Sequence, residues 1–102
     1  VYWANELSDP YTAIGLAEYV SIRERVLGPD HPDTLASRNN LAYAYESAGD
    51  LGQAIPLYEA TLTDMERVLG PDHPATLTSR NNLAYAQKEM RLQKRRGRGA
   101  SR

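Results

Sequence analysis

The chain has 102 residues, of which 41% are apolar and 25% are charged, and its formal net charge is −1. These values are typical of one small water-soluble domain, and no apolar run approaches the ~18 residues of a membrane-spanning helix. The chain has no cysteine, which excludes disulfides, thiolate metal sites and cysteine nucleophiles.

Charge is distributed unevenly along the chain. Lys88–Arg102 contains seven basic residues and one acid, for a net +6, whereas residues 1–87 carry a net −7. A basic end of this kind is typical of segments that contact phosphate backbones, acidic partners or anionic surfaces, and equally of a solubilising end. No aromatic side chain interleaves it, so nucleic-acid binding is disfavoured.

The N-terminal half contains two predicted helices. Residues 1–7 are apolar and aromatic, and we interpret them as the last turns of a helix. Ser8-Asp9-Pro10 is a helix start, and apolar residues then recur at helical spacing, which predicts a helix at about 9–27. Gly28-Pro29 ends that helix, and the next one is predicted at about 32–48, with a Pro at its first position.

A third helix is predicted at about 51–69. Asp50, with Gln53 three residues later, indicates an N-cap and a capping box. Pro56 lies within this range, where it would remove one backbone hydrogen bond and bend the helix, unless the first turn begins later.

The last helix is predicted from residue 74 to about 95. No breaker occurs before Gly97, and residues 97–102 are polar and rich in glycine, so we expect a disordered basic tail there.

One stretch of 21 residues occurs twice, at an offset of 42. Arg25–Tyr45 reads RVLGPDHPDTLASRNNLAYAY and Arg67–Gln87 reads RVLGPDHPATLTSRNNLAYAQ, identical at 18 of 21 positions. A fixed period of this size is typical of repeat proteins, and a repeated surface indicates a repeated contact rather than a single catalytic centre. Short loops make neighbouring helices antiparallel. We therefore predict an all-α fold, an α-solenoid of about four helices stacked as helical hairpins.

The repeated residues carry a family resemblance. Asn40-Leu41-Ala42, Gly49-Asp50 and Tyr58, with LGPDHP and NNLA in both copies, resemble the tetratricopeptide repeat. The 42-residue period looks like the long-repeat subfamily found in kinesin light chains. The resemblance implies one helical repeat domain at 1–96, followed by the tail at 97–102, with repeat units of about 1–31, 32–73 and 74–96.

The resemblance implies a non-catalytic scaffold that binds a peptide or protein segment in a concave groove, lined by the first helix of each pair. Helical spacing puts two matching sets on or beside that face: Ala36, Asn39, Asn40, Tyr43, Glu46 and Ser47, then Thr78, Asn81, Asn82, Tyr85, Lys88 and Glu89. In groove-binding family members an Asn at the position of Asn40 and Asn82 bonds the ligand's backbone. The predicted peptide-binding residues are Asn39, Asn40, Tyr43, Asn81, Asn82 and Tyr85.

The Asn pairs and the tyrosines each leave a second interpretation open. Asn in mid-helix costs roughly 0.5 kcal/mol relative to Ala, so the amides either contact a ligand or bond to the neighbouring repeat. Tyr43 and Tyr85 either contact a ligand or face solvent, whereas Tyr45 and Tyr58 are expected in the core.

We predict no catalytic site, no metal site and no cofactor. His31 and His73 occur once per repeat before a Pro at a helix start, which is poor metal geometry and typical of a loop or an N-cap. No nucleophile with an oriented base and no Gly-rich phosphate loop is visible in the sequence.

Self-association is the alternative function. Val1-Tyr2-Trp3 is apolar and the last helix lacks a partner, whereas solenoids need polar caps on their terminal repeats. Nucleic-acid binding through the tail is less favoured, and no membrane partner is expected. Glu6 and Asp9 interrupt any signal-peptide pattern, so we expect a cytoplasmic protein.

Overall fold

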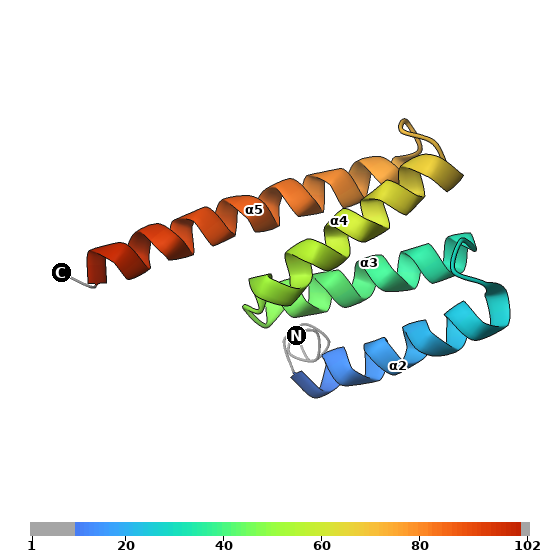
Figure 1. The fold of residues 1–102 in the computed structure, drawn as a ribbon, viewed down its shortest axis with the longest axis horizontal. Helices are drawn as coiled ribbons and strands as arrows, with labels where there is room; N and C mark the ends of the chain where they lie inside the picture. The colour runs from blue at the N-terminus through green and yellow to red at the C-terminus, as the bar shows by residue number, and fades with distance from the viewer. Residues whose placement is uncertain (1–9, 101–102) are drawn as a thin grey trace.

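The computed structural model describes residues 10–100, and within them it contains four helices and no strand (Figure 1). The helices are α2 (Pro10–Leu27), α3 (Pro32–Ser47), α4 (Leu51–Val68) and α5 (Pro74–Ala100). The predicted all-α class is therefore confirmed. The predicted helix end at residues 1–7 lies outside the described residues.

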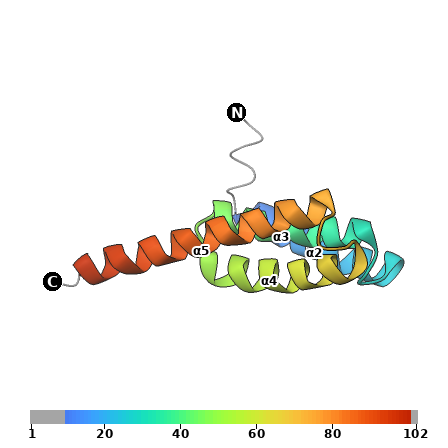
Figure 2. The ribbon, with the colours of Figure 1, turned by 90° about the horizontal axis from the view of Figure 1, so that it is seen from above.

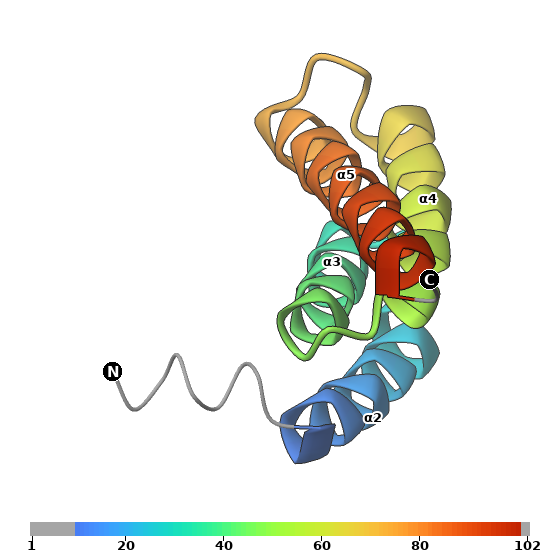
Figure 3. The ribbon, with the colours of Figure 1, turned by 90° about the vertical axis from the view of Figure 1, so that its left-hand side faces the viewer.

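Each helix packs antiparallel against the next one in the chain, and α3 also contacts α5. Seen from one end, α3 and α5 lie on the same side of α4, and α2 packs under α3 (Figure 3). This is the stacking expected of a helical solenoid. The first copy of the duplicated sequence runs from the end of α2 into α3, and the second runs from the end of α4 into α5.

Glycine and histidine set the turns between the hairpins. Gly28 and Gly70 adopt φ of 96° and 100°, a left-handed conformation that residues with a Cβ adopt rarely. His31 then caps α3, and its Nδ1 accepts from the backbone N–H of Asp33 at 3.0 Å. His73 accepts in the same way from Ala75 N–H at 3.1 Å. The N-cap interpretation of the two histidines is confirmed.

The cap of α4 differs slightly from the predicted capping box. Asp50 Oδ1 accepts from the backbone N–H of Gln53 at 3.2 Å, as expected. The Gln53 side chain, however, donates to Asp50 Oδ2 at 2.6 Å instead of reaching the backbone. The helix begins at Leu51, so Pro56 lies inside it and on its exposed side.

The last helix extends further than the sequence suggested. We expected it to end at about residue 95, but α5 continues to Ala100, so residues 97–100 of the expected tail are helical. Extending a formed helix through a glycine costs only about 1 kcal/mol, and no proline follows to stop it. Residues 101–102 lie outside the described residues.

The core is built from small residues around one tyrosine. Tyr58 is fully buried in α4 and packs with Ala42 of α3 and Ala86 of α5, together with Leu51 and Ala54. Tyr45 packs half-buried against this cluster and against a second one that joins α2 to α3. Small residues let the helices approach closely, and the tyrosine ring fills the space between them. The predicted core placement is confirmed for Tyr58, whereas Tyr45 packs against the core and is only partly buried.

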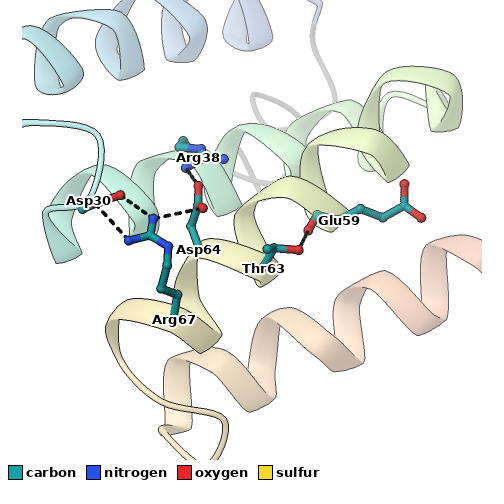
Figure 4. A network of polar contacts seen from close by, with 6 residues as sticks. All are labelled: Asp30, Arg38, Glu59, Thr63, Asp64 and Arg67. Carbon is teal, nitrogen blue, oxygen red and sulfur yellow. Dashed lines mark hydrogen bonds and ion pairs between the residues drawn. The ribbon is translucent and has the colours of Figure 1, made fainter.

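An ion-pair network ties α3 and its preceding loop to α4 (Figure 4). Arg38 on α3 donates to Asp64 on α4 at 2.7 Å. Arg67 donates to both carboxylate oxygens of Asp30, at 3.1 and 2.7 Å, and to Asp64 at 3.2 Å. These contacts hold the pKa values of Asp64 and Asp30 below 3.8, through hydrogen bonds from Arg38 and Arg67 respectively. The pair with Asp30 is exposed, so it contributes little to stability.

The two copies of the duplicated sequence differ in what covers them. Leu35 of α3 is 0% exposed, but its counterpart Leu77 of α5 is 41% exposed. Ala42 is likewise buried, whereas Ala84 is exposed. Within the described residues, therefore, the face of α5 that corresponds to the α4-covered face of α3 is open to solvent.

Candidate functional site

Two buried threonines set α3 and α5 in matching positions. Thr34 Oγ1 on α3 donates to the backbone oxygen of Arg23 on α2 at 3.4 Å, and Thr76 Oγ1 on α5 donates to that of Met65 on α4 at 3.5 Å. Both threonines are 0% exposed. Each first helix thus rests on the preceding helix in the same way, and residues 42 apart face the same side of the solenoid.

A pocket of about 420 Å³ lies between α3 and α5 and is partly open to solvent. Along α5 its lining residues are spaced three or four apart, which places them on one stripe of the helix. The remaining lining comes from the C-terminal half of α3, the following turn and the start of α4. The lining residues are Tyr43, Glu46, Ser47, Gly49, Leu51, Asn82, Tyr85, Glu89 and Gln93.

Three of the six predicted binding residues line this pocket, namely Tyr43, Asn82 and Tyr85. Tyr43 is 45% and Tyr85 is 57% exposed. The other three, Asn39, Asn40 and Asn81, are not part of its lining. Asn40 and Asn81 are exposed, and Asn39 is half-buried.

The four Asn side chains form no hydrogen bond with any other residue that the structure describes. The Asn39 Oδ1 is buried without a partner. The interpretation in which the amides bond to the neighbouring repeat therefore finds no support in residues 10–100. The donor and acceptor of Asn82 remain available at the pocket wall.

Glu46, which lines the pocket, is held in place by a hydrogen bond from the core. Tyr58, at 0% exposure, donates its hydroxyl to Glu46 Oε1 at 2.8 Å. Burial raises the pKa of Tyr58 well above its usual value, and the hydrogen bond to Glu46 adds to the shift. The core tyrosine thus orients a charged group at the surface of the pocket.

Sequence reasoning found part of the pocket and missed the rest. Glu46, Ser47 and Glu89 fall on the predicted face but were not chosen as binding residues. Leu51 was missed because it belongs to the core-facing start of α4, and Gln93 because it lies beyond the duplicated stretch. The absence of a helix breaker after residue 90 was the available signal, since a continuing helix presents Gln93 four residues after Glu89.

Among residues 10–100, no group of three or more His, Cys, Asp and Glu side chains could hold a metal ion. Among the helices described, none is long and apolar enough to cross a membrane.

The helical hairpins, the 42-residue period and the pocket on the first helices together define a class of repeat protein. Residues 16–33 and 34–75 match the family model described as tetratricopeptide repeat. The chain belongs to the tetratricopeptide repeat family, and repeats of this family generally mediate interactions between proteins.

A curated plant protein shows which kind of repeat this is. The chain is 41% identical over 58 residues to Protein KINESIN LIGHT CHAIN-RELATED 2 of Arabidopsis thaliana, a match that covers 57% of this chain and 8% of the relative. The repeats are therefore kinesin-light-chain-like, as the sequence predicted. The chain spans only a small part of that relative's length.

Proposed function

We propose that the chain binds an extended peptide segment of another protein in the pocket between α3 and α5, without a catalytic step. The observation that carries this proposal is the pocket of about 420 Å³ on the face made by the first helices of two repeats. Concave sites with a few polar groups and aromatic walls are typical of ligand binding. A cytoplasmic location remains a prediction.

Asn82 and the two tyrosines are the residues that we expect to hold the peptide. The Asn82 amide offers one acceptor and two donors, which matches a peptide backbone. Tyr43 and Tyr85 border the pocket with half-exposed rings, and rings of this kind gain binding energy at little cost in side-chain entropy. In this proposal Asn40, Asn39 and Asn81 make smaller contributions, because they lie outside the lining.

The experiment selects binding peptides from a displayed random library and measures their affinity for variants of the chain. Asn82→Ala should weaken binding about ten-fold, since a pair of hydrogen bonds is worth roughly 1–1.5 kcal/mol. Asn81→Ala is the matched control, because it removes the same side chain from the next position, outside the pocket. Equal losses in both variants, or no peptide recovered from the library, would contradict the proposal.

Self-association is a second candidate, favoured by the open face of α5 around Leu77. The helix α2 of a second copy corresponds to α4 at the 42-residue offset and also exposes an apolar face, with Tyr19 45% and Ile22 47% exposed. The fit is imperfect, because Tyr19 takes the position of the buried Thr61, and Ile22 that of Asp64. We therefore expect weak association.

Sedimentation equilibrium over a range of protein concentrations tests this second candidate. Leu77→Ser should reduce association. Ile22→Asp should strengthen it, because the new carboxylate on one copy would pair with Arg80 of the other, as Asp64 pairs with Arg38 within the chain. A monomer at every concentration, with both variants unchanged, rules it out.

A further inference from the structure

The charged side chains that line the pocket between α3 and α5 are all acidic. Two carboxylates, Glu46 from α3 and Glu89 from α5, belong to its lining, and no lysine or arginine does. The remaining polar lining consists of neutral amides and hydroxyls. The pocket therefore contributes negative charge from two different helices.

These two carboxylates differ from the carboxylates on the α4 side of the molecule. Asp30, Asp64 and Glu66 each pair with an arginine. Among residues 10–100, neither Glu46 nor Glu89 forms an ion pair. Glu46 has one neutral donor, the Tyr58 hydroxyl at 2.8 Å, which leaves most of its acceptor capacity unused.

The aromatic side chains of the pocket suit a cation as well. Tyr43 and Tyr85 stand in the lining with 45% and 57% of their surfaces exposed. A cation over such a ring is attracted by its quadrupole, and the molecule already contains one example, with the guanidinium of Arg23 4.4 Å from the ring centroid of Tyr19.

We propose that this pocket takes a lysine or arginine side chain of an extended peptide segment from another protein, between Glu46 and Glu89 and against the tyrosine rings. The proposal rests on the peptide-binding function above and specifies the charge of the peptide. Asn82 and Gln93 belong to the same lining, where their amides can bond the backbone that carries the cation.

The chain's own basic segment is not the expected occupant. Its residues from Lys88 to Arg96 belong to α5, which runs straight past the ends of the other helices (Figures 1 and 2). None of its basic residues up to Arg96 belongs to the pocket lining, to which α5 contributes Asn82, Tyr85, Glu89 and Gln93. A rod also lacks the free backbone groups that an extended peptide offers to Asn82.

Titration followed by amide NMR shifts of the labelled chain tests the proposal. The probe is N-acetyl-arginine methylamide, and the matched control is N-acetyl-citrulline methylamide, which has nearly the same shape and no charge. We expect the arginine compound to shift the amides of the pocket lining and to bind about five-fold more tightly than citrulline. Added salt should reduce the difference.

Glu89→Gln should abolish this preference, and Glu46→Gln should reduce it. Glu59→Gln is the control for overall charge, because Glu59 is an exposed carboxylate of α4 outside the pocket. It should leave the preference unchanged. Retained folding of each variant is read from the same spectra.

The outcomes separate this inference from the function on which it rests. If both compounds bind equally at the pocket, or neither shifts its residues, the cation preference is overturned. The peptide-binding function would still be supported if the library yields peptides whose binding is weakened by Asn82→Ala but which are not enriched in Lys or Arg. If no library peptide binds at all, both proposals are overturned.

Discussion

The guanidinium of Arg38 on α3 lies 2.7 Å from the carboxylate of Asp64 on α4, and only 12% and 29% of the two side chains are exposed. Its counterpart Arg80, 42 residues later, pairs instead with Glu66 at 2.9 Å, and both of those side chains are 42% exposed. The same arginine of the repeat is thus shielded in one copy and exposed in the other. Their energetic contributions should differ accordingly.

Asp64→Asn should lower the free energy of unfolding by about 1–2 kcal/mol, because it leaves a largely buried guanidinium without its charged partner. Glu66→Gln is the matched control and should change it by less than about 0.5 kcal/mol, since both partners are exposed. Urea denaturation followed by circular dichroism measures both values. Equal effects of the two variants would contradict the burial argument.

The contribution of Asp64 should also depend on pH. Hydrogen bonds from Arg38 and then Arg67 hold the pKa of Asp64 in the folded chain below the ordinary value of 3.8. A carboxyl with a lowered pKa stabilises the fold fully above its unfolded-state pKa, and this contribution is lost as the pH falls through its folded-state pKa. The stability difference between wild type and Asp64→Asn should therefore be constant from neutral pH down to mildly acidic pH and shrink below 3.8. A difference that persists in strong acid would contradict this assignment.

Tyr58→Phe should cost about 1 kcal/mol of unfolding free energy, because it keeps the buried ring but removes the hydrogen bond to Glu46. Tyr85→Phe, at 57% exposure, should cost almost nothing. Thermal unfolding of the two variants measures the contrast. Absorbance titration at alkaline pH gives a second measurement. Because burial raises the pKa of Tyr58, the wild type should contain one late-ionising tyrosine that is absent from the Tyr58→Phe variant.

His73→Ala should cost about 1 kcal/mol, because the Nδ1 of His73 caps α5 by accepting from Ala75 N–H at 3.1 Å. His73→Asn should restore most of the stability, since an Asn oxygen is a good N-cap acceptor. Differential scanning calorimetry of the two variants tests this role. If Asn is no better than Ala, the imidazole contributes through packing and not through the cap.

The repeated helix-ending and helix-starting residues made the fold predictable. Gly28 and Gly70 mark helix ends, and Pro32 and Pro74 mark the starts of α3 and α5. Local signals of this kind depend little on the rest of the molecule. The end of α5 was less predictable, because Gly97 weakens a helix without stopping it.

The pocket was only partly predictable, for a different reason. Leu35 and Leu77 follow the same residue in the same repeated motif, yet one is 0% and the other 41% exposed. Asn39 and Asn81 also differ in burial despite identical neighbours. Burial depends on which helix lies alongside, and no local pattern contains that information. The same limit applies to Asn40, which helical spacing placed on the binding face and the structure places outside the pocket lining.

The length of α5 has a consequence for any partner that touches more than the pocket. A helix rises 1.5 Å per residue, so Arg96 stands roughly 10 Å beyond Glu89 along the axis. This distance is fixed by a rigid element, unlike the variable reach of a flexible tether. A partner that contacts both the pocket and the basic C-terminal part of α5 must therefore match the fixed spacing between them as well as their charges.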